Sequence, residues 1–543
     1  MPQDAAAQAP AKTLTERLDA LFAPWDRTDE PGLVVGVAKD GEVTYRRGFG
    51  MASLETALAN TPNTRMRIGS ISKHFTCLLA LLLAEDGKLD LDQPIRAYIP
   101  ELAGPGGEPT LRQLMQHRGG SRCYLDIGFI GHGMSVPPLG RALAIQQRQS
   151  GRNFAPGEAM IYNNGGYHLV SIAIERVGGA PFEAQLKTRL FDVVGMPDTA
   201  SIPSDYFITP GIAAMHLPSR HGWRRGLFAS DEIRGEGAIV STVDDMLRWT
   251  AHLRARDRFG SAKSWAALTE RPRYDDGSTG AYALGLLIGD YRGRPIVHHS
   301  GGVSGGTAQM LTFPDDGLDV VLLCNGARNA DVGKLSQQAA DILLEDRLGP
   351  ATPTISAEAF KPLLGDYWSP QNRMIYSLLD EEGVLKLAIA KSPVGAPLVR
   401  GDDARLFCPA SGIGEISVRP VGAQLEVSFG GETLVYDQLV ESNGDAQAFA
   451  SAAAGRYASA DADATAMIET NGEELTLSLS DGLGKVVAPL SVLSPTVAYS
   501  RPKGPMAVFR TTLSLDIDGG RATGFRLNTP RTRDLEFQRL ADA

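Results

Sequence analysis

The chain has few cysteines, and its histidines form no recognisable metal-binding pattern. Four cysteines occur in 543 residues, all far apart: Cys77, Cys123, Cys324 and Cys408. Because no Cys-x-x-Cys pair occurs, the sequence indicates neither a zinc site nor a redox motif, and we expect small buried thiols. The nine histidines include the adjacent pair His298 and His299 but no His-Glu-x-x-His sequence, so the common zinc-protease helix is also excluded.

An excess of positive charge is absent as well, since the formal net charge is -10. Binding to a phosphate backbone needs a basic surface, so we expect no nucleic-acid partner. The longest apolar run, Cys77–Ala84, is far too short to cross a membrane. Residues 1–12 are rich in Ala and Gln and lack the basic and apolar regions of a secretory signal. We therefore expect a disordered N-terminus and a cytoplasmic protein that has no membrane partner.

What the chain does contain is an ordinary globular composition, with 43% apolar and 21% charged residues, over a length typical of about three domains. An Asp40–Gly41 turn joins two apolar runs, Gly32–Ala38 and Val43–Tyr45, and predicts an antiparallel hairpin. Strand patterns return between Leu284 and Leu323, after a mostly helical stretch. We predict that residues 13–348 form one mixed α/β domain whose sheet is completed by both ends of the segment.

The remainder of the chain is rich in short strand patterns and carries an internal repeat. Leu364–Ser369 resembles Ala454–Ser459, and further matches follow in the same order at similar spacing. We predict two β modules, residues 356–441 and 454–543, each suited in size to a small antiparallel barrel. The residues between them, 442–453, are poor in large apolar side chains and predict a flexible linker.

The first candidate for chemistry is Ser70, which stands three positions before Lys73 at the start of an apolar helical stretch. At this spacing the two side chains share one face of a helix, so an amine lies beside a hydroxyl. A serine becomes a nucleophile only when a neighbouring base takes its proton, and a helix start also favours a developing oxyanion. The same tetrad can equally be a helix-capping serine and a surface lysine, so partners elsewhere must decide.

Two further clusters in the large domain could supply those partners. Tyr162 and Asn164 stand two apart, just before a helix predicted from Asn164 to Val177. His299, Ser300 and Gly301 follow a predicted strand, where small residues allow a substrate to approach the backbone. Considered separately, each cluster is explained as well by core packing, helix capping or a polar turn.

In this order and spacing, the three motifs resemble those of the penicillin-recognising serine hydrolases: class C β-lactamases, DD-peptidases, related esterases and D-aminopeptidases. Segments between the motifs also look like those of the family, namely Thr110–His117, Phe154–Gly157 and Gly237–Trp249, and the resemblance covers Leu33 to Leu348. Many members carry Lys-Thr-Gly where this chain has His299-Ser300-Gly301. Histidine at this position and two added β modules are similar to the D-aminopeptidases, which are the closest resemblance.

The resemblance implies a β-lactamase/DD-peptidase-like α/β (α+β) catalytic domain followed by two small antiparallel β-barrel domains. It implies acyl transfer through an ester of Ser70, with Lys73 and Tyr162 moving the proton to the leaving group and either of them acting as the base. Backbone N–H groups of Ser70 and Gly302 hold the oxyanion. The other roles go to Asn164, which orients substrate and Lys73, to His299, which polarises the site, and to the substrate strand at Ser300 and Gly301. No metal or other cofactor is required.

In the D-aminopeptidases a loop of the last barrel enters the active site and offers an aspartate to the substrate amine. The comparable stretch here, Arg501–Arg510, has no carboxylate, and its specificity-loop residues are Arg501, Lys503 and Gly504. A cationic loop repels an ammonium group and attracts a carboxylate. Alternatively, Asp516 or Asp518 reaches inward, or the loop only packs on the large domain.

The function we expect is a D-stereospecific aminopeptidase that releases N-terminal D-amino acids from peptides, amides or esters. The partners are then a small peptide or amide substrate and a second copy of the chain, because similar D-aminopeptidases are homodimers. One alternative is an esterase or DD-carboxypeptidase-like hydrolase that uses the same serine. Another is a peptide-binding sensor that keeps the fold without turnover.

Overall fold

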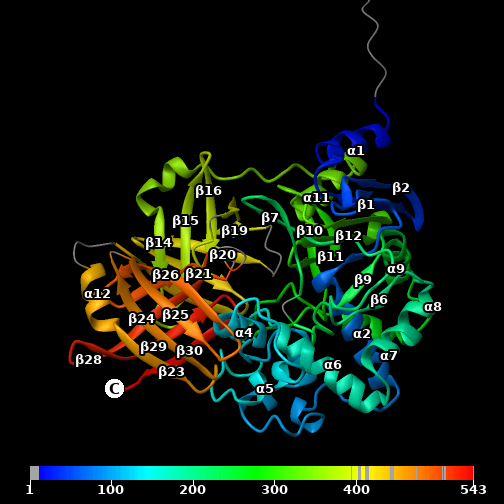
Figure 1. Ribbon diagram of the computed structural model, residues 1–543. Helices are drawn as coiled ribbons and strands as arrows, with labels where there is room; N and C mark the ends of the chain where they lie inside the picture. The colour runs from blue at the N-terminus through cyan, green and yellow to red at the C-terminus, as the bar shows by residue number, and fades with distance from the viewer. Residues whose placement is uncertain are drawn as a thin grey trace, which may run out of the picture.

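The computed structural model describes residues 12–228, 230–392, 394–401, 405–409, 415–440, 445–472, 474–503, 506 and 509–541. Residues 1–11 of the predicted disordered N-terminus lie outside the described residues, as does Gly504. Figure 1 shows the N-terminal half on one side, with two C-terminal β structures beside it. No helix within the described ranges is long and apolar enough to cross a membrane.

A six-stranded sheet lies at the centre of the first domain, and its strand order is β10-β11-β12-β13-β1-β2. The strands are β1 (Leu33–Lys39), β2 (Glu42–Phe49), β10 (Leu287–Tyr291), β11 (Arg294–Val303), β12 (Gly306–Phe313) and β13 (Leu318–Cys324). The predicted hairpin is confirmed, because β1 pairs with β2. β1 also pairs antiparallel with β13, from Leu33 opposite Cys324 to Lys39 opposite Leu318. Both ends of the segment therefore complete one sheet, as the sequence predicted.

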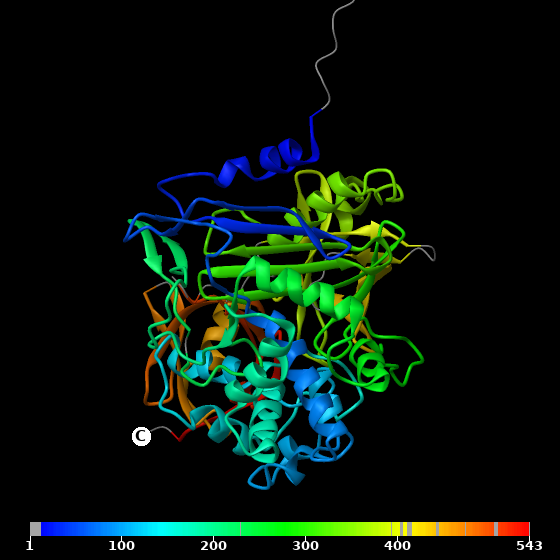
Figure 2. The same cartoon turned by 90° about the vertical axis from the view of Figure 1, so that its right-hand side faces the viewer.

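Helices cover both faces of this sheet (Figure 2). Alternate residues of β1 enter separate cores, since side chains along a strand point to opposite faces. Val35 packs in one core with α1 (Leu14–Phe22) and α11 (Val332–Leu343). Val34 packs in the other core with α9 (Val243–Ala255) and the central helix α2 (Ser72–Glu85).

Helix α2 is buried on every side from Ser72 to Leu83, which places it in the middle of the domain. It packs against α6 (Asn164–Gly178). The helix was expected to start near Ser70, but Gly69–Ile71 forms a separate 3₁₀ turn before it. Gly69 has a φ of +53°, which glycine adopts readily, so the chain turns sharply just before the serine.

The C-terminal part contains a nine-stranded antiparallel sheet and a closed eight-stranded barrel. The sheet comprises β14 (Gly365–Trp368), β15 (Ile375–Glu381), β16 (Val384–Ile389), β17 (Ala396–Pro397), β18 (Val399–Arg400), β19 (Leu406–Cys408), β20 (Ile416–Val421), β21 (Gln424–Phe429) and β22 (Glu432–Gln438). The barrel comprises β23 (Gly455–Ser459), β24 (Ala464–Asn471), β25 (Glu474–Ser480), β26 (Lys485–Ser494), β27 (Val497–Ser500), β28 (Thr511–Asp518), β29 (Arg521–Thr529) and β30 (Thr532–Arg539). Both C-terminal modules are thus antiparallel β structures, as expected.

The internal repeat has a structural counterpart at the first strand of each module. Tyr367 and Tyr457 are both fully buried. The Tyr367 hydroxyl donates a hydrogen bond to the Leu363 carbonyl at 2.6 Å, and the Tyr457 hydroxyl donates to the Ala453 carbonyl at 2.5 Å. In each case the acceptor lies four residues earlier, so the repeated sequence builds the same local contact twice.

The flexible linker predicted for residues 442–453 is wrong over most of its length, because Asp445–Ala453 forms helix α12. Phe449 and Ala453 of this helix are fully buried in the core of the barrel. Figure 1 shows α12 against one end of the barrel. Phe449, Ala452 and Ala453 pack this helix into the barrel core, which the composition of the segment did not indicate.

The barrel is attached to the first domain around helix α4 (Tyr124–His132), which contacts β25 and β26. Just before this helix, the buried Arg122 side chain donates to the Arg533 carbonyl at 2.8 Å and pairs with Asp461 at 2.6 Å. His132, at the other end of the helix, contacts Asp481 at 2.6 Å. These contacts bring two loops of the barrel to the face of the first domain that carries Ser70.

Candidate active site

Ser70 and Lys73 are in contact at the start of the central helix. The Lys73 ammonium nitrogen lies 2.9 Å from the Ser70 hydroxyl oxygen and donates to the Glu236 carbonyl at 2.6 Å. The Lys73 side chain is completely buried. Burial lowers the pKa of Lys73 to about 7, although the Glu236 carboxylate acts against this shift. An amine that loses its proton near neutral pH is suited to take the proton of Ser70.

Glu236 is a site residue that the sequence analysis missed. Its carboxylate is 3% exposed and accepts hydrogen bonds from the Tyr124 hydroxyl at 2.6 Å and the Arg234 backbone N–H at 3.0 Å. Burial raises the pKa of this carboxyl group above its ordinary value. The only sequence signal was its place beside Gly237, within a segment similar to the family pattern.

Tyr162 lies in the loop before α6, and its side chain hydrogen-bonds with that of Ser70. Burial raises the pKa of Tyr162 above its ordinary value, so the phenol keeps its proton at neutral pH. The Lys73 nitrogen is 4.8 Å from the centre of the Tyr162 ring. Asn163, not Asn164, caps the helix, because its side-chain oxygen accepts from the Gly165 N–H at 2.7 Å. Asn164 is therefore available to line the pocket beside Ser70.

His299 is buried in β11, with 1% of its surface exposed. Its Nδ1 is 2.6 Å from the Ser300 carbonyl, which fixes the ring proton there, and its Nε2 accepts from the Tyr282 hydroxyl at 3.0 Å. Burial, reinforced by Lys73, lowers the pKa of His299 to about 3. The imidazole is therefore neutral, and it orients the Tyr282 side chain.

Two further aromatic residues of this cluster, Tyr282 and His117, were not predicted from the sequence as site residues. Tyr282 stacks edge-on against Tyr162, with 5.9 Å between ring centres. The ring centre of His117 lies 4.1 Å from that of Tyr162. The Asn163 backbone N–H donates to His117 Nδ1 at 3.0 Å. Burial holds the pKa of His117 well below its ordinary value. The neutral rings of His117 and Tyr282 thus fix the position of Tyr162.

Strand β11 continues to Val303 instead of ending at His299, so Gly301 and Gly302 both lie within it. The two glycines have different surroundings. A Cβ atom on Gly301 would lie 1.9 Å from the Ile68 carbonyl oxygen, so this strand packs directly against the turn that carries Ser70. A Cβ atom on Gly302 would meet nothing within 4 Å, and Gly302 lines the pocket.

We expect Gly301→Ala to reveal this difference. The added methyl group must push β11 away from the nucleophile turn, which should lower the free energy of unfolding by about 1–3 kcal/mol and reduce activity. Urea denaturation measures the change. Gly302→Ala is the matched control and should leave stability unaltered. Equal stability of both variants would contradict the close approach at Gly301.

A model of the beta-lactamase family matches residues 13–344. The chain belongs to the beta-lactamase family. A D-aminopeptidase of Brucella ovis is 27% identical to it over 359 residues, which are 65% of this chain and 66% of the relative, just under two thirds. The protein is therefore an enzyme, a serine hydrolase, and the predicted resemblance is confirmed.

Solved structures agree on the fold. An octameric penicillin-binding protein homologue from Pyrococcus abyssi aligns with 78% of this chain and 99% of its own, with a TM-score of 0.54 and 23% identity. A D-amino acid amidase from Ochrobactrum anthropi SV3, complexed with D-phenylalanine, aligns with 62% of this chain and 99% of its own, with a TM-score of 0.53 and 21% identity. The β-lactamase-like fold expected from the motifs is thus confirmed.

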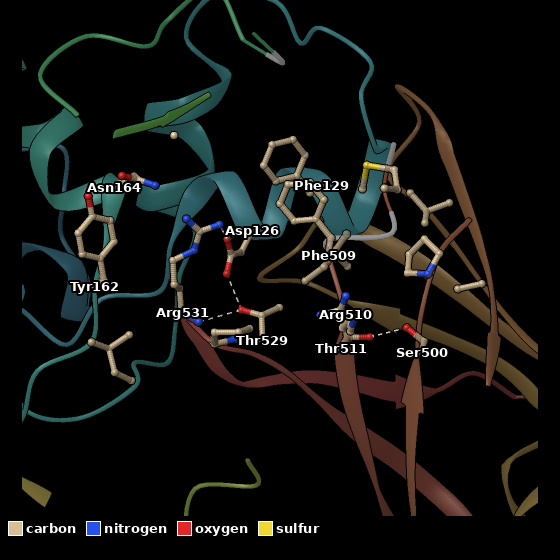
Figure 3. Close-up of a pocket in the computed structure, with 18 of the residues that line it drawn as sticks. Asp126, Phe129, Tyr162, Asn164, Ser500, Phe509, Arg510, Thr511, Thr529 and Arg531 are labelled. Carbon is tan, nitrogen blue, oxygen red and sulfur yellow. Dashed lines mark hydrogen bonds and ion pairs between the residues drawn. The ribbon is translucent and has the colours of Figure 1, made fainter. Parts of the chain in front are cut away.

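In this member of the family, Ser70 opens into a pocket of about 550 Å³ between the catalytic domain and the barrel. The barrel contributes residues from two loops and the strand ends beside them: Ser500, Pro502, Met506, Phe509, Arg510, Thr511, Thr529, Pro530 and Arg531. Figure 3 labels six of these, Ser500, Phe509, Arg510, Thr511, Thr529 and Arg531. Phe509 packs on Phe129 of α4, with 3.9 Å between ring centres. A second pocket of about 360 Å³ lies on another side of Ser70 and is lined by Leu217, Leu227 and Glu236. The two pockets together form a cleft that can hold groups on both sides of a scissile bond.

Two of the residues predicted for the specificity loop, Arg501 and Lys503, lie away from this cleft, and the third, Gly504, lies outside the described residues. Arg501 is exposed and does not line the pocket. Lys503 has 80% of its side chain exposed and lies 3.8 Å from Glu474. Asp516, considered as an inward-pointing carboxylate, pairs with Arg526 at 3.0 Å. Within the described part of the chain, no group of three His, Cys, Asp or Glu side chains could bind a metal ion.

Proposed function

We propose that the protein is a D-stereospecific aminopeptidase or amidase, which releases an N-terminal D-residue through an acyl-enzyme on Ser70. The observation that carries the acyl-enzyme chemistry is the buried Lys73, whose amine contacts the Ser70 hydroxyl at 2.9 Å and has a pKa of about 7. The D-specific substrate rests on relatives of this chain that are named D-aminopeptidase and on the D-amino acid amidase fold.

In the proposed reaction, Lys73 takes the hydroxyl proton of Ser70 while Oγ attacks the carbonyl carbon. The backbone N–H groups of Ser70 and Gly302 stabilise the oxyanion. Tyr162, protonated at neutral pH, donates its proton to the leaving amine and regains one from Lys73. The C–N bond breaks, and an ester of Ser70 remains. A water molecule then cleaves this ester, with the proton moving along the same groups in reverse.

The other predicted residues support this pair. Asn164 orients the substrate and Lys73 from the first turn of α6. His299, being neutral, contributes through Tyr282 and not through a positive charge. The predicted polarising effect of His299 then acts through this hydrogen bond, and Lys73 is the group in the cluster that gains and loses a proton near neutral pH.

D-alanine p-nitroanilide and its L-isomer test the proposal. We expect a kcat/KM ratio of D over L of about 100 or more, since a misplaced side chain removes the reacting carbonyl from its attack position. Release of p-nitroaniline measures the rate, and p-nitrophenyl acetate serves as an achiral control for the reactivity of Ser70. A rapid ester hydrolysis with no anilide turnover would instead support the esterase alternative.

A further inference from the structure

Two arginines from the barrel enter the pocket of Ser70 (Figure 3). Arg531 lies in the turn between β29 and β30, and Arg510 directly precedes β28. Neither was among the predicted site residues. Both are donors that match the planar geometry of a carboxylate.

Arg531 is held in place by a buried acid of the catalytic domain. It forms an ion pair with Asp126 in the first turn of α4, whose side chain is 2% exposed. The second carboxylate oxygen of Asp126 accepts from the Thr529 hydroxyl. Since a guanidinium group has five N–H donors, one ion pair leaves others for the pocket, and 27% of the Arg531 side chain is exposed. Asp126 thus orients Arg531 without using all of its donors.

Arg510 has no such partner. Among the described residues no carboxylate pairs with it, and its Nε–H is buried without an acceptor. Two cationic side chains therefore face one acid in a pocket whose other walls include Leu477, Leu479 and Val486. Apolar walls weaken screening, so the excess positive charge acts strongly on anything that enters.

We propose that Arg510 and Arg531 form a binding site for a free carboxylate of the substrate. The proposal rests on the proposed function and specifies it further. The preferred substrate is a short peptide with an N-terminal D-residue and a free C-terminal carboxylate, and a neutral amide of the same length is a poor one. The barrel then selects substrates by their acidic end.

D-alanylglycine and D-alanylglycinamide test this site, because they differ only in the carboxylate. We expect kcat/KM to be about 10- to 100-fold higher for the acid, the range of one or two charge-assisted hydrogen bonds. Arg510→Gln should lower this ratio several-fold, and Arg531→Gln should bring it close to one. Arg501→Gln is the matched control, an exposed cation beside the same loop, and should leave the ratio unchanged.

Calorimetry with the Ser70→Ala variant measures how tightly D-alanylglycine and its amide bind in the absence of catalysis. The carboxylate site can therefore be tested separately from the proposed function. Tighter binding of D-alanylglycine than of its amide, lost in Ser70→Ala/Arg510→Gln, supports the carboxylate site even when catalysis fails. Equal binding of the two compounds overturns the carboxylate site, and the anilide assay then still decides the proposed function. An Arg510 variant that weakens both compounds equally also overturns it, since a selective anion site must discriminate.

Discussion

Replacing Ser70 by alanine should lower the turnover of D-alanine p-nitroanilide by about 10⁴-fold or more, as loss of a covalent nucleophile does elsewhere. Ser70 Oγ contacts both Lys73 and Tyr162, so the substitution removes the attacking atom and the centre of that hydrogen-bond network. The fold should persist, because Ser70 caps no backbone group in its turn. Kinetics, circular dichroism and thermal unfolding measure these effects.

Ser72→Ala is the matched control, two residues further along, at the first position of α2. The Ser72 hydroxyl accepts a hydrogen bond from the Ile239 backbone N–H at 3.2 Å and is fully buried. Its loss should cost about 1–3 kcal/mol of stability through the unsatisfied N–H but keep most of the activity. Near-normal turnover in Ser70→Ala, or an acyl adduct on another residue in the mass spectrum, would refute the assignment of the nucleophile.

Local patterns explain why much of the catalytic centre could be predicted from the sequence. Ser70 and Lys73 are three residues apart, so helical geometry alone brings them together. The Asp40–Gly41 hairpin likewise follows from short-range turn preferences, and pairing of β1 with β13 follows from matching strand patterns at the two ends of the domain. Tyr162 and Asn164 were identified by their order along the chain relative to Ser70, which the family resemblance supplied.

The substrate end of the site could not be predicted in this way. Thr529 and Asp126, which hold Arg531, are 403 positions apart and meet only because the barrel docks on α4. Neither the Thr-Pro-Arg-Thr turn nor an aspartate in a helical first turn carries a local signal for this contact. The positive charge of residues 501–510 indicates the segment before β28, but the exposure of Arg501 and Lys503 depends on how that loop folds over the barrel.

The protonation state of Lys73 could not be predicted from the sequence either, since its pKa depends on the burial of the side chain in the folded protein. With a pKa of about 7, most of the amine is protonated below neutral pH and cannot accept the proton of Ser70. We therefore expect the wild-type kcat/KM to rise about tenfold per pH unit below 7 and to level off above it. Tyr162→Phe should be slower but should keep this inflection, since the high pKa of the phenol places its own titration outside this range.

Lys73→Met should reduce kcat/KM by about 10²–10⁴-fold, the usual contribution of a positioned base. The methionine fills a similar space without a buried amine, so the protein should remain folded. Lys73→Arg is the decisive companion variant, because an arginine keeps the positive charge but cannot lose its proton near neutral pH. If Lys73 acts only by placing charge near the oxyanion, Lys73→Arg retains activity across this pH range, because the arginine keeps its charge where Lys73 would lose its proton. If Lys73 is the base, both variants are equally slow and the inflection disappears, which is the result that the buried contact with Ser70 leads us to expect.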